Sequence, residues 1–131
     1  MVDTRMKIQY GFVTLLLVLA GCGGSQQFVA MPPEALKNNV PHQALEMKAE
    51  RYEFIPDTVR VKVGTLVQIA ITAIDGTHGF ELSAFGIDER QDEHETKTIE
   101  FFASQRGVYG FRCSHFCGLG HLGMTGTIII E

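Results

Sequence analysis

The chain has 131 residues, of which 45% are hydrophobic and 20% are charged, and its formal net charge is -4. This length fits one domain, this composition excludes a disordered tail protein, and an acidic chain without lysine and arginine clusters excludes nucleic acid as a partner. The three cysteines cannot all pair within the chain, so at least one is expected to be reactive, lipid-bearing or metal-bound.

The N-terminal segment has the pattern of an export signal. Arg5 and Lys7 precede an apolar run at 11–20, which is shorter than the roughly 20 residues that a membrane-spanning helix needs. The run ends in Leu-Ala-Gly-Cys at 19–22, which resembles the bacterial lipobox. This resemblance implies cleavage after residue 21 and acylation of Cys22. We therefore expect a signal peptide at 1–21 and a membrane-anchored lipoprotein outside the cytoplasm, on the periplasmic side or the cell surface.

A polar segment separates this signal from the rest of the chain. Residues 22–44 are rich in glycine, serine, glutamine, asparagine and proline and show no sustained period. Such a composition predicts a lipidated tether, with one helical turn at 33–37 begun by a proline.

The pattern beyond residue 45 predicts β-structure. Residues 58–63 alternate apolar and polar side chains, and a nearly continuous apolar run follows at 66–72. Further strands are predicted at 47–52, 79–82, 96–103, 108–113 and 126–131. Since no segment has a sustained 3.6-residue period, residues 45–131 are predicted to form one small antiparallel β-sandwich. The aromatic residues Tyr52, Phe54 and Phe85 are expected in its core.

The loop before the last predicted strand is dense in metal-binding side chains. Five of them lie within twelve residues: Cys113, His115, Cys117, His121 and Met124. The glycines between them let the backbone turn tightly enough for these side chains to converge. Thiolate, imidazole and thioether together favour copper. His78 begins a predicted strand elsewhere in the chain and is the best candidate for a ligand from outside the loop.

Three other interpretations of these residues remain open. Cys113 and Cys117 can form a disulfide, because the predicted compartment is oxidising. They can bind zinc together with His78 and His121. A mononuclear blue-copper site needs two histidines, one thiolate and a weak axial methionine, which makes Cys117 surplus. A second thiolate four residues from the first is what two bridged copper ions require.

The spacing Cys-x3-Cys-x3-His-x2-Met at 113–124, with Asp75-x2-His78 upstream, resembles the CuA domain of cytochrome c oxidase subunit II and of nitrous oxide reductase. The resemblance implies an all-β, cupredoxin-like Greek-key sandwich with the metal loop before the last strand, and a mixed-valence centre of two copper ions. It also implies that both cysteines bridge the ions. One ion would then take His78 and Met124, and the other would take His121 and the backbone carbonyl of His115.

The same resemblance suggests a function. A site in which protein groups fill every coordination position leaves none for a substrate, so it passes electrons and carries out no bond chemistry. We expect single-electron transfer on the outer face of the membrane, by a subunit II-like or accessory donor to a terminal oxidase. The expected partners are the catalytic subunit of that oxidase and a cytochrome c or other small redox protein. The alternative is a copper-handling protein that stores Cu(I) or delivers it to an oxidase.

Several features depart from the CuA family. The sequence has no tryptophan for electron entry, and it predicts a lipoprotein signal in place of a transmembrane hairpin. His115 stands where many members carry a glutamate, and its side chain is expected to be exposed, with only its carbonyl in use. The acidic stretch 88–95 would steer a basic cytochrome, or it is simply a solvated loop. His42 and His94 are expected to be exposed and not to bind metal.

Overall fold

The computed structural model describes residues 34–131, and the predicted signal peptide, Cys22 and most of the predicted tether lie outside this range. Helix α1 (Glu34–Lys37) is a single turn that overlaps the predicted one. Within the described residues, no helix is both long enough and apolar enough to cross a membrane.

Nine strands make up most of the described part of the chain. They are β1 (His42–Glu50), β2 (Glu53–Ile55), β3 (Thr58–Val61), β4 (Leu66–Ala73), β5 (His78–Leu82), β6 (Ile87–Gln91), β7 (Thr96–Phe102), β8 (Gly107–Arg112) and β9 (Thr125–Ile130). Short 3-10 turns follow β5 and precede β9: η1 (Ser83–Phe85) and η2 (His121–Gly123). The prediction of an all-β, cupredoxin-like sandwich is confirmed, with α1 as the one α-helical turn among residues 34–131.

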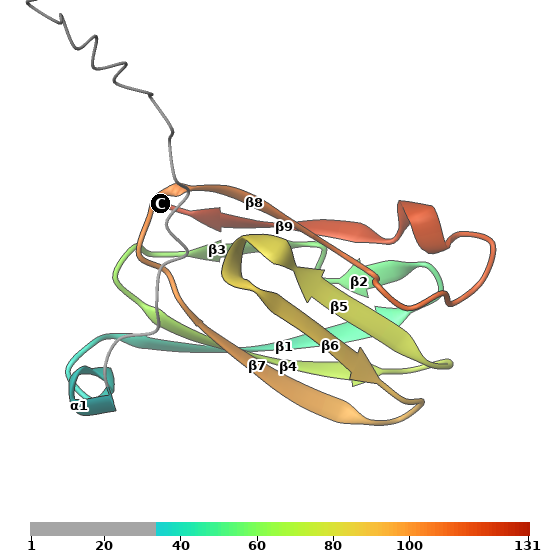
Figure 1. Ribbon diagram of the computed structural model, residues 1–131, viewed down its shortest axis with the longest axis horizontal. Helices are drawn as coiled ribbons and strands as arrows, with labels where there is room; N and C mark the ends of the chain where they lie inside the picture. The colour runs from blue at the N-terminus through green and yellow to red at the C-terminus, as the bar shows by residue number, and fades with distance from the viewer. Residues whose placement is uncertain (1–33) are drawn as a thin grey trace, which may run out of the picture.

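The strands form two sheets that pack face to face (Figure 1). One sheet has the order β2-β1-β4-β7 and the other the order β3-β9-β8-β5-β6. The prediction of a purely antiparallel sandwich is wrong, because β1 pairs in parallel with β4, and β3 pairs in parallel with β9. The chain leaves the first sheet after β2, adds β3 to the second sheet and then returns as β4. This crossover makes β1 and β4 run in the same direction.

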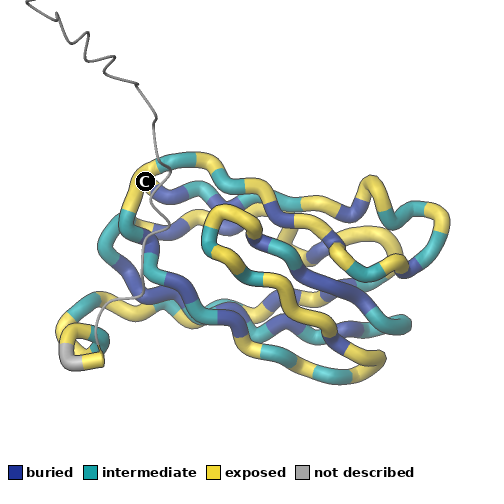
Figure 2. The backbone as a smooth tube through the Cα atoms, in the orientation of Figure 1, coloured by how far each residue is buried: buried dark blue, intermediate teal, exposed yellow. Residues whose placement is uncertain are grey.

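The core fills the space between the sheets, with buried positions alternating along the strands (Figure 2). Phe54 of β2 contacts Phe80 and Phe111 of the opposite sheet, with ring centroids 5.7 and 5.2 Å apart. Phe85 is half-buried against Phe101. Tyr52 is 40% exposed, so its expected place in the core is wrong. It lies in the turn between β1 and β2, where no opposite sheet covers it.

Three strand assignments differ from the prediction. β1 begins at His42, within the segment predicted as a tether, and β2 and β6 were not predicted. The solvated-loop interpretation of residues 88–95 is wrong for the first half, because Ile87–Gln91 pairs with β5 as an edge strand. Its outer positions are exposed and charged, and Gln91 is fully buried. His42 and His94 are exposed, as predicted.

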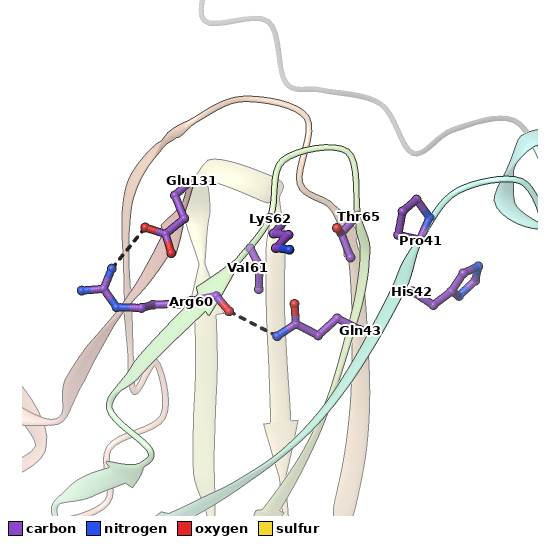
Figure 3. A pocket seen from close by; sticks show the side chains of 8 residues that line it. All are labelled: Pro41, His42, Gln43, Arg60, Val61, Lys62, Thr65 and Glu131. Atoms are coloured by element: carbon purple, nitrogen blue, oxygen red, sulfur yellow. Dashed lines mark hydrogen bonds and ion pairs between the residues drawn. The ribbon is translucent and has the colours of Figure 1, made fainter.

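The two ends of the sandwich are chemically different. At one end, the start of β1 and the C-terminus border a groove of about 410 Å³ that is lined mostly by polar residues (Figure 3). Several of its side chains already have partners: Arg60 pairs with Glu131 at 3.4 Å, and Gln43 donates to the Arg60 carbonyl at 3.2 Å. The loop between β8 and β9 lies at the other end (Figure 1). This groove is therefore remote from the cysteines.

Candidate metal centre

The first candidate ligand, His78, enters the core because it begins β5. Alternate residues of a strand share a face, so His78 points inward with Phe80 and Leu82, and all three are fully buried. Asp75, in the turn before β5, accepts a hydrogen bond from His78 Nε2 at 3.0 Å. The other ring nitrogen, Nδ1, is buried without a hydrogen-bond partner. Because an unpaired buried polar atom is costly, this nitrogen is suited to bind a metal ion.

The two cysteines reach the same place from β8. Cys113 follows the buried Phe111 by two residues and therefore also points inward. The Cys113 backbone N–H donates to the Met124 carbonyl at 2.9 Å, which closes the loop 113–124 at its base. Within this loop Cys117 turns back, so that its Sγ lies 3.8 Å from Cys113 Sγ. His78, Cys113 and Cys117 each contribute one potential ligand atom, and these three atoms lie within 4.8 Å of one another.

The remaining predicted ligands surround the sulfur pair. Met124 Sδ and His121 Nδ1 each lie 3.8 Å from Cys117 Sγ, and Met124 is fully buried. The His115 carbonyl accepts a hydrogen bond from the Cys113 thiol at 3.1 Å. The His115 side chain has no part in these contacts, but it is half-buried, so the prediction that it is exposed is wrong. The structure thus brings together every atom that the sequence singled out in this loop and in β5.

The cysteines are free thiols in this structure. Their sulfur separation of 3.8 Å is far longer than the bond of about 2.05 Å in a disulfide. Burial, together with the neighbouring Cys113, raises the pKa of the Cys117 thiol to about 11. Two thiolates this close would repel each other strongly unless a cation lay between them. Hence the donor set fits metal ions that supply positive charge and prefer sulfur.

Close approach of the backbone fixes the position of the loop. A side chain on Gly79 would place its Cβ 2.6 Å from the His115 backbone nitrogen, so only glycine lets β5 lie this close to the cysteine loop. The Gly79 N–H in turn donates to Cys113 Sγ at 3.5 Å. On the outer side, the Ser114 hydroxyl donates to Asp88 of β6 at 2.6 Å. This last contact was not predicted, because nothing local to Ser114 indicates that β6 lies beside it.

The surface over the metal loop is apolar. Phe116 is 70% exposed, Leu122 is 91% exposed and Leu119 is 99% exposed. The Phe116 ring lies 5.7 Å from the ring of the half-buried His121. We call these three residues the apolar rim. Because large apolar side chains are seldom left this exposed together, the rim marks a surface suited to contact with another protein.

Comparisons with known proteins show which family the chain resembles. Residues 34–131 match the family model of the periplasmic domain of cytochrome c oxidase subunit II. The chain is 29% identical over 103 residues to cytochrome c oxidase subunit 2 of Thermus thermophilus, covering 78% of this chain and 76% of that protein. It is also 33% identical over 76 residues to the nitrous-oxide reductase of Ralstonia nicotianae, covering 55% of this chain and 12% of the reductase.

Solved structures show the same fold. A chain of a heme-copper terminal oxidase dimer superimposes with a TM-score of 0.66 and 26% identity, covering 73% of this chain and 68% of that one. The periplasmic domain of subunit II of cytochrome oxidase from Bradyrhizobium japonicum gives a TM-score of 0.63 and 18% identity, covering 67% and 83%. The family model covers most of the chain, and the structure describes all of that region. This protein therefore belongs to the family of cytochrome c oxidase subunit II periplasmic domains.

Proposed function

We propose that this domain holds a CuA-type centre of two copper ions and transfers single electrons. The observation that carries the proposal is the pair of buried free thiols 3.8 Å apart, ringed by three further donor atoms. These are the unpartnered Nδ1 of His78, the Nδ1 of His121 and the thioether sulfur of Met124. The His115 carbonyl completes the proposed ligand set. When bound, two copper ions that share one electron supply reversible one-electron redox chemistry.

The donor chemistry favours two copper ions over the alternatives. Zinc would use two thiolates and two imidazoles and would leave the buried Met124 thioether without a role. One blue copper ion would use a single thiolate and leave the second one buried beside it. Both cysteines and Met124 are buried at this site, so a centre that uses all three sulfurs leaves no buried donor idle.

The surroundings of the site favour electron transfer over bond chemistry. His78 is fully buried, and Cys113, Cys117 and Met124 pack in the hydrophobic core. This packing restricts how far these donors move when the charge at the centre changes. His121 is half-buried and lies beside the apolar rim. We infer that a redox partner docks on this rim, because contact there brings the partner next to a proposed ligand.

The family relationship supports a location outside the cytoplasm, since the matching family model is a periplasmic domain. We propose that acylated Cys22 anchors the domain to the membrane through the segment 22–44. In that position the domain would act as a subunit II-like or accessory donor to a terminal oxidase. Its proposed partners are the oxidase catalytic subunit and a cytochrome c or other small redox protein.

Voltammetry combined with a copper-exchange assay tests this function. An electron-transfer domain should give a reversible one-electron wave and should retain its copper when mixed with a Cu(I) chelator of moderate affinity. A copper-delivery protein should lose its copper rapidly to the chelator and give no reversible wave. The second outcome would replace the proposed function with storage or delivery of Cu(I).

A further inference from the structure

The turn between β1 and β2 touches both segments that carry the proposed ligands. It consists of two residues, Arg51 and Tyr52, because Glu50 and Glu53 on either side are already paired across the hairpin. The Tyr52 ring lies against the metal loop, where a Cβ on Gly120 would come within 2.3 Å of it. Nothing in the sequence singles out Arg51, since an arginine in a polar turn belongs to no recognisable pattern.

Arg51 makes hydrogen bonds in two directions. Its backbone N–H donates to the Asp75 carboxylate, at 3.1 Å to Oδ1 and 2.9 Å to Oδ2. The same Oδ1 accepts from His78 Nε2 at 3.0 Å. The Arg51 side chain donates from Nε to the Cys117 carbonyl at 3.1 Å. One residue therefore connects the segment that orients His78 with the loop that carries Cys117.

The Arg51 guanidinium also packs closely on the turn before β5. A Cβ on Gly76 would lie 2.7 Å from its Nη2 atom, and Gly76 has a φ of +130°, in the region that favours glycine. The side chain is thus held between Gly76 and the Cys117 carbonyl. Since an arginine is charged at every ordinary pH, it places a fixed positive charge next to the Cys117 backbone.

We propose that Arg51 is a positioning residue for the metal centre. It holds the Cys117 loop at a fixed position relative to His78, both before and after metal binds. The copper measurements that test this inference rest on the proposed function. The contact between Arg51 and the Cys117 loop, in contrast, is present in the metal-free protein. A fixed positive charge near the centre also favours the reduced state, so Arg51 should raise the reduction potential.

The variant Arg51→Ala isolates the side-chain contact, because alanine keeps the backbone N–H that binds Asp75. The matched control is Arg60→Ala, which removes another exposed arginine with one ion pair, at the opposite end of the sandwich. Arg51→Lys keeps the positive charge and a hydrogen-bond donor. It should therefore restore part of the copper affinity and of the reduction potential that Arg51→Ala loses.

Copper competition titrations and voltammetry should separate these variants. Loss of a residue that orients ligands typically lowers metal affinity roughly 10–100-fold, and Arg51→Ala should show a loss of that size together with a lower reduction potential. Arg60→Ala should match the wild type in both measurements. If Arg51→Ala binds copper as tightly as Arg60→Ala and at an unchanged potential, the inference is wrong while the proposed function stands.

Amide hydrogen exchange on the metal-free proteins tests the restraint without copper. Arg51→Ala should speed exchange in the loop 113–124 by about two- to tenfold, the effect of losing one hydrogen bond, and Arg60→Ala should not. If the wild type takes up no copper, the proposed function fails, and this exchange experiment still decides the role of Arg51. Equal loop exchange in the Arg51→Ala and Arg60→Ala proteins would overturn the inference.

Discussion

Replacing Gly79 by alanine should displace the cysteine loop, because β5 has no room for a methyl group at this point. The new Cβ would lie 2.3 Å from the Ser114 hydroxyl and 2.6 Å from the His115 backbone nitrogen. The hydroxyl can rotate away, but the backbone nitrogen cannot. A distance of 2.6 Å is about 0.8 Å shorter than the 3.4 Å at which ordinary contact begins, so the strand or the loop must move by roughly that much.

The structure sets the size of this effect. Forcing an extra methyl group into a well-packed site costs about 1–3 kcal/mol. For a domain of this size, each kcal/mol lowers Tm by about 4–8 °C, so Tm should fall by roughly 5–20 °C. Thermal unfolding of the metal-free protein, followed by circular dichroism, measures the change. Copper affinity should also fall, because moving β5 away from the loop would disturb the hydrogen bond from the residue-79 N–H to Cys113 Sγ.

Gly123→Ala is the matched control for this experiment. Gly123 lies in the metal loop, but a Cβ built there has no atom within 4 Å. Its unfolding free energy should therefore stay within about 0.5 kcal/mol of the wild type. If Gly79→Ala melts at the same temperature as Gly123→Ala, the close approach of β5 to the loop does not restrict the site as described.

Three further predictions follow from other parts of the molecule. Cys117→Ser should retain at most one copper ion per chain by metal analysis, and retention of two would show that Cys117 is no bridge. Hydrogen bonds from Gln68 and Lys37 lower the pKa of the Glu100 carboxyl from its ordinary 4.5. The ionised carboxylate therefore stabilises the folded state above pH 4.5, and this contribution is lost as the pH falls below it. In urea unfolding, Glu100→Gln should be less stable than the wild type at neutral pH, and this deficit should shrink as the pH falls below 4.5. A deficit that stays the same over this pH range would contradict this. Leu119→Ser should leave Tm unchanged, because the side chain is 99% exposed, but should slow reduction by a soluble cytochrome c in stopped-flow experiments. An unchanged rate would remove the apolar rim from the docking surface.

The sequence predicts this fold well where strands have one buried face and poorly where they do not. The side chains of β3 alternate between polar and apolar, and those of β4 are mostly apolar, because the inner positions of both strands fill the core. β6 is an edge strand whose residues 88–90 are exposed and charged, so its sequence has no apolar period and resembles a loop. The parallel pairing of β1 with β4 also escapes prediction. The residue pattern of a strand records which face is buried, while the direction of its neighbour depends on the path of the whole chain.

The candidate site was predictable for a different reason. Its donors are residue types with distinctive chemistry, and most of them lie in one short loop. In the structure, Cys117 Sγ lies near 4 Å from the donor atoms of Cys113, His121 and Met124. The supporting contacts are not predictable in this way. Arg51 bonds to Cys117 across 66 positions, and Ser114 bonds to Asp88 across 26. Arginine, serine and aspartate are common on any surface, so only the fold shows that these ones support the loop.

Copper analysis of the loaded protein, combined with electron paramagnetic resonance, tests the central claim most directly. We predict two copper ions per chain that share one unpaired electron, seen as hyperfine splitting by two equivalent copper nuclei. One copper ion per chain with an intense blue thiolate band, or zinc retained in preference to copper, would contradict it.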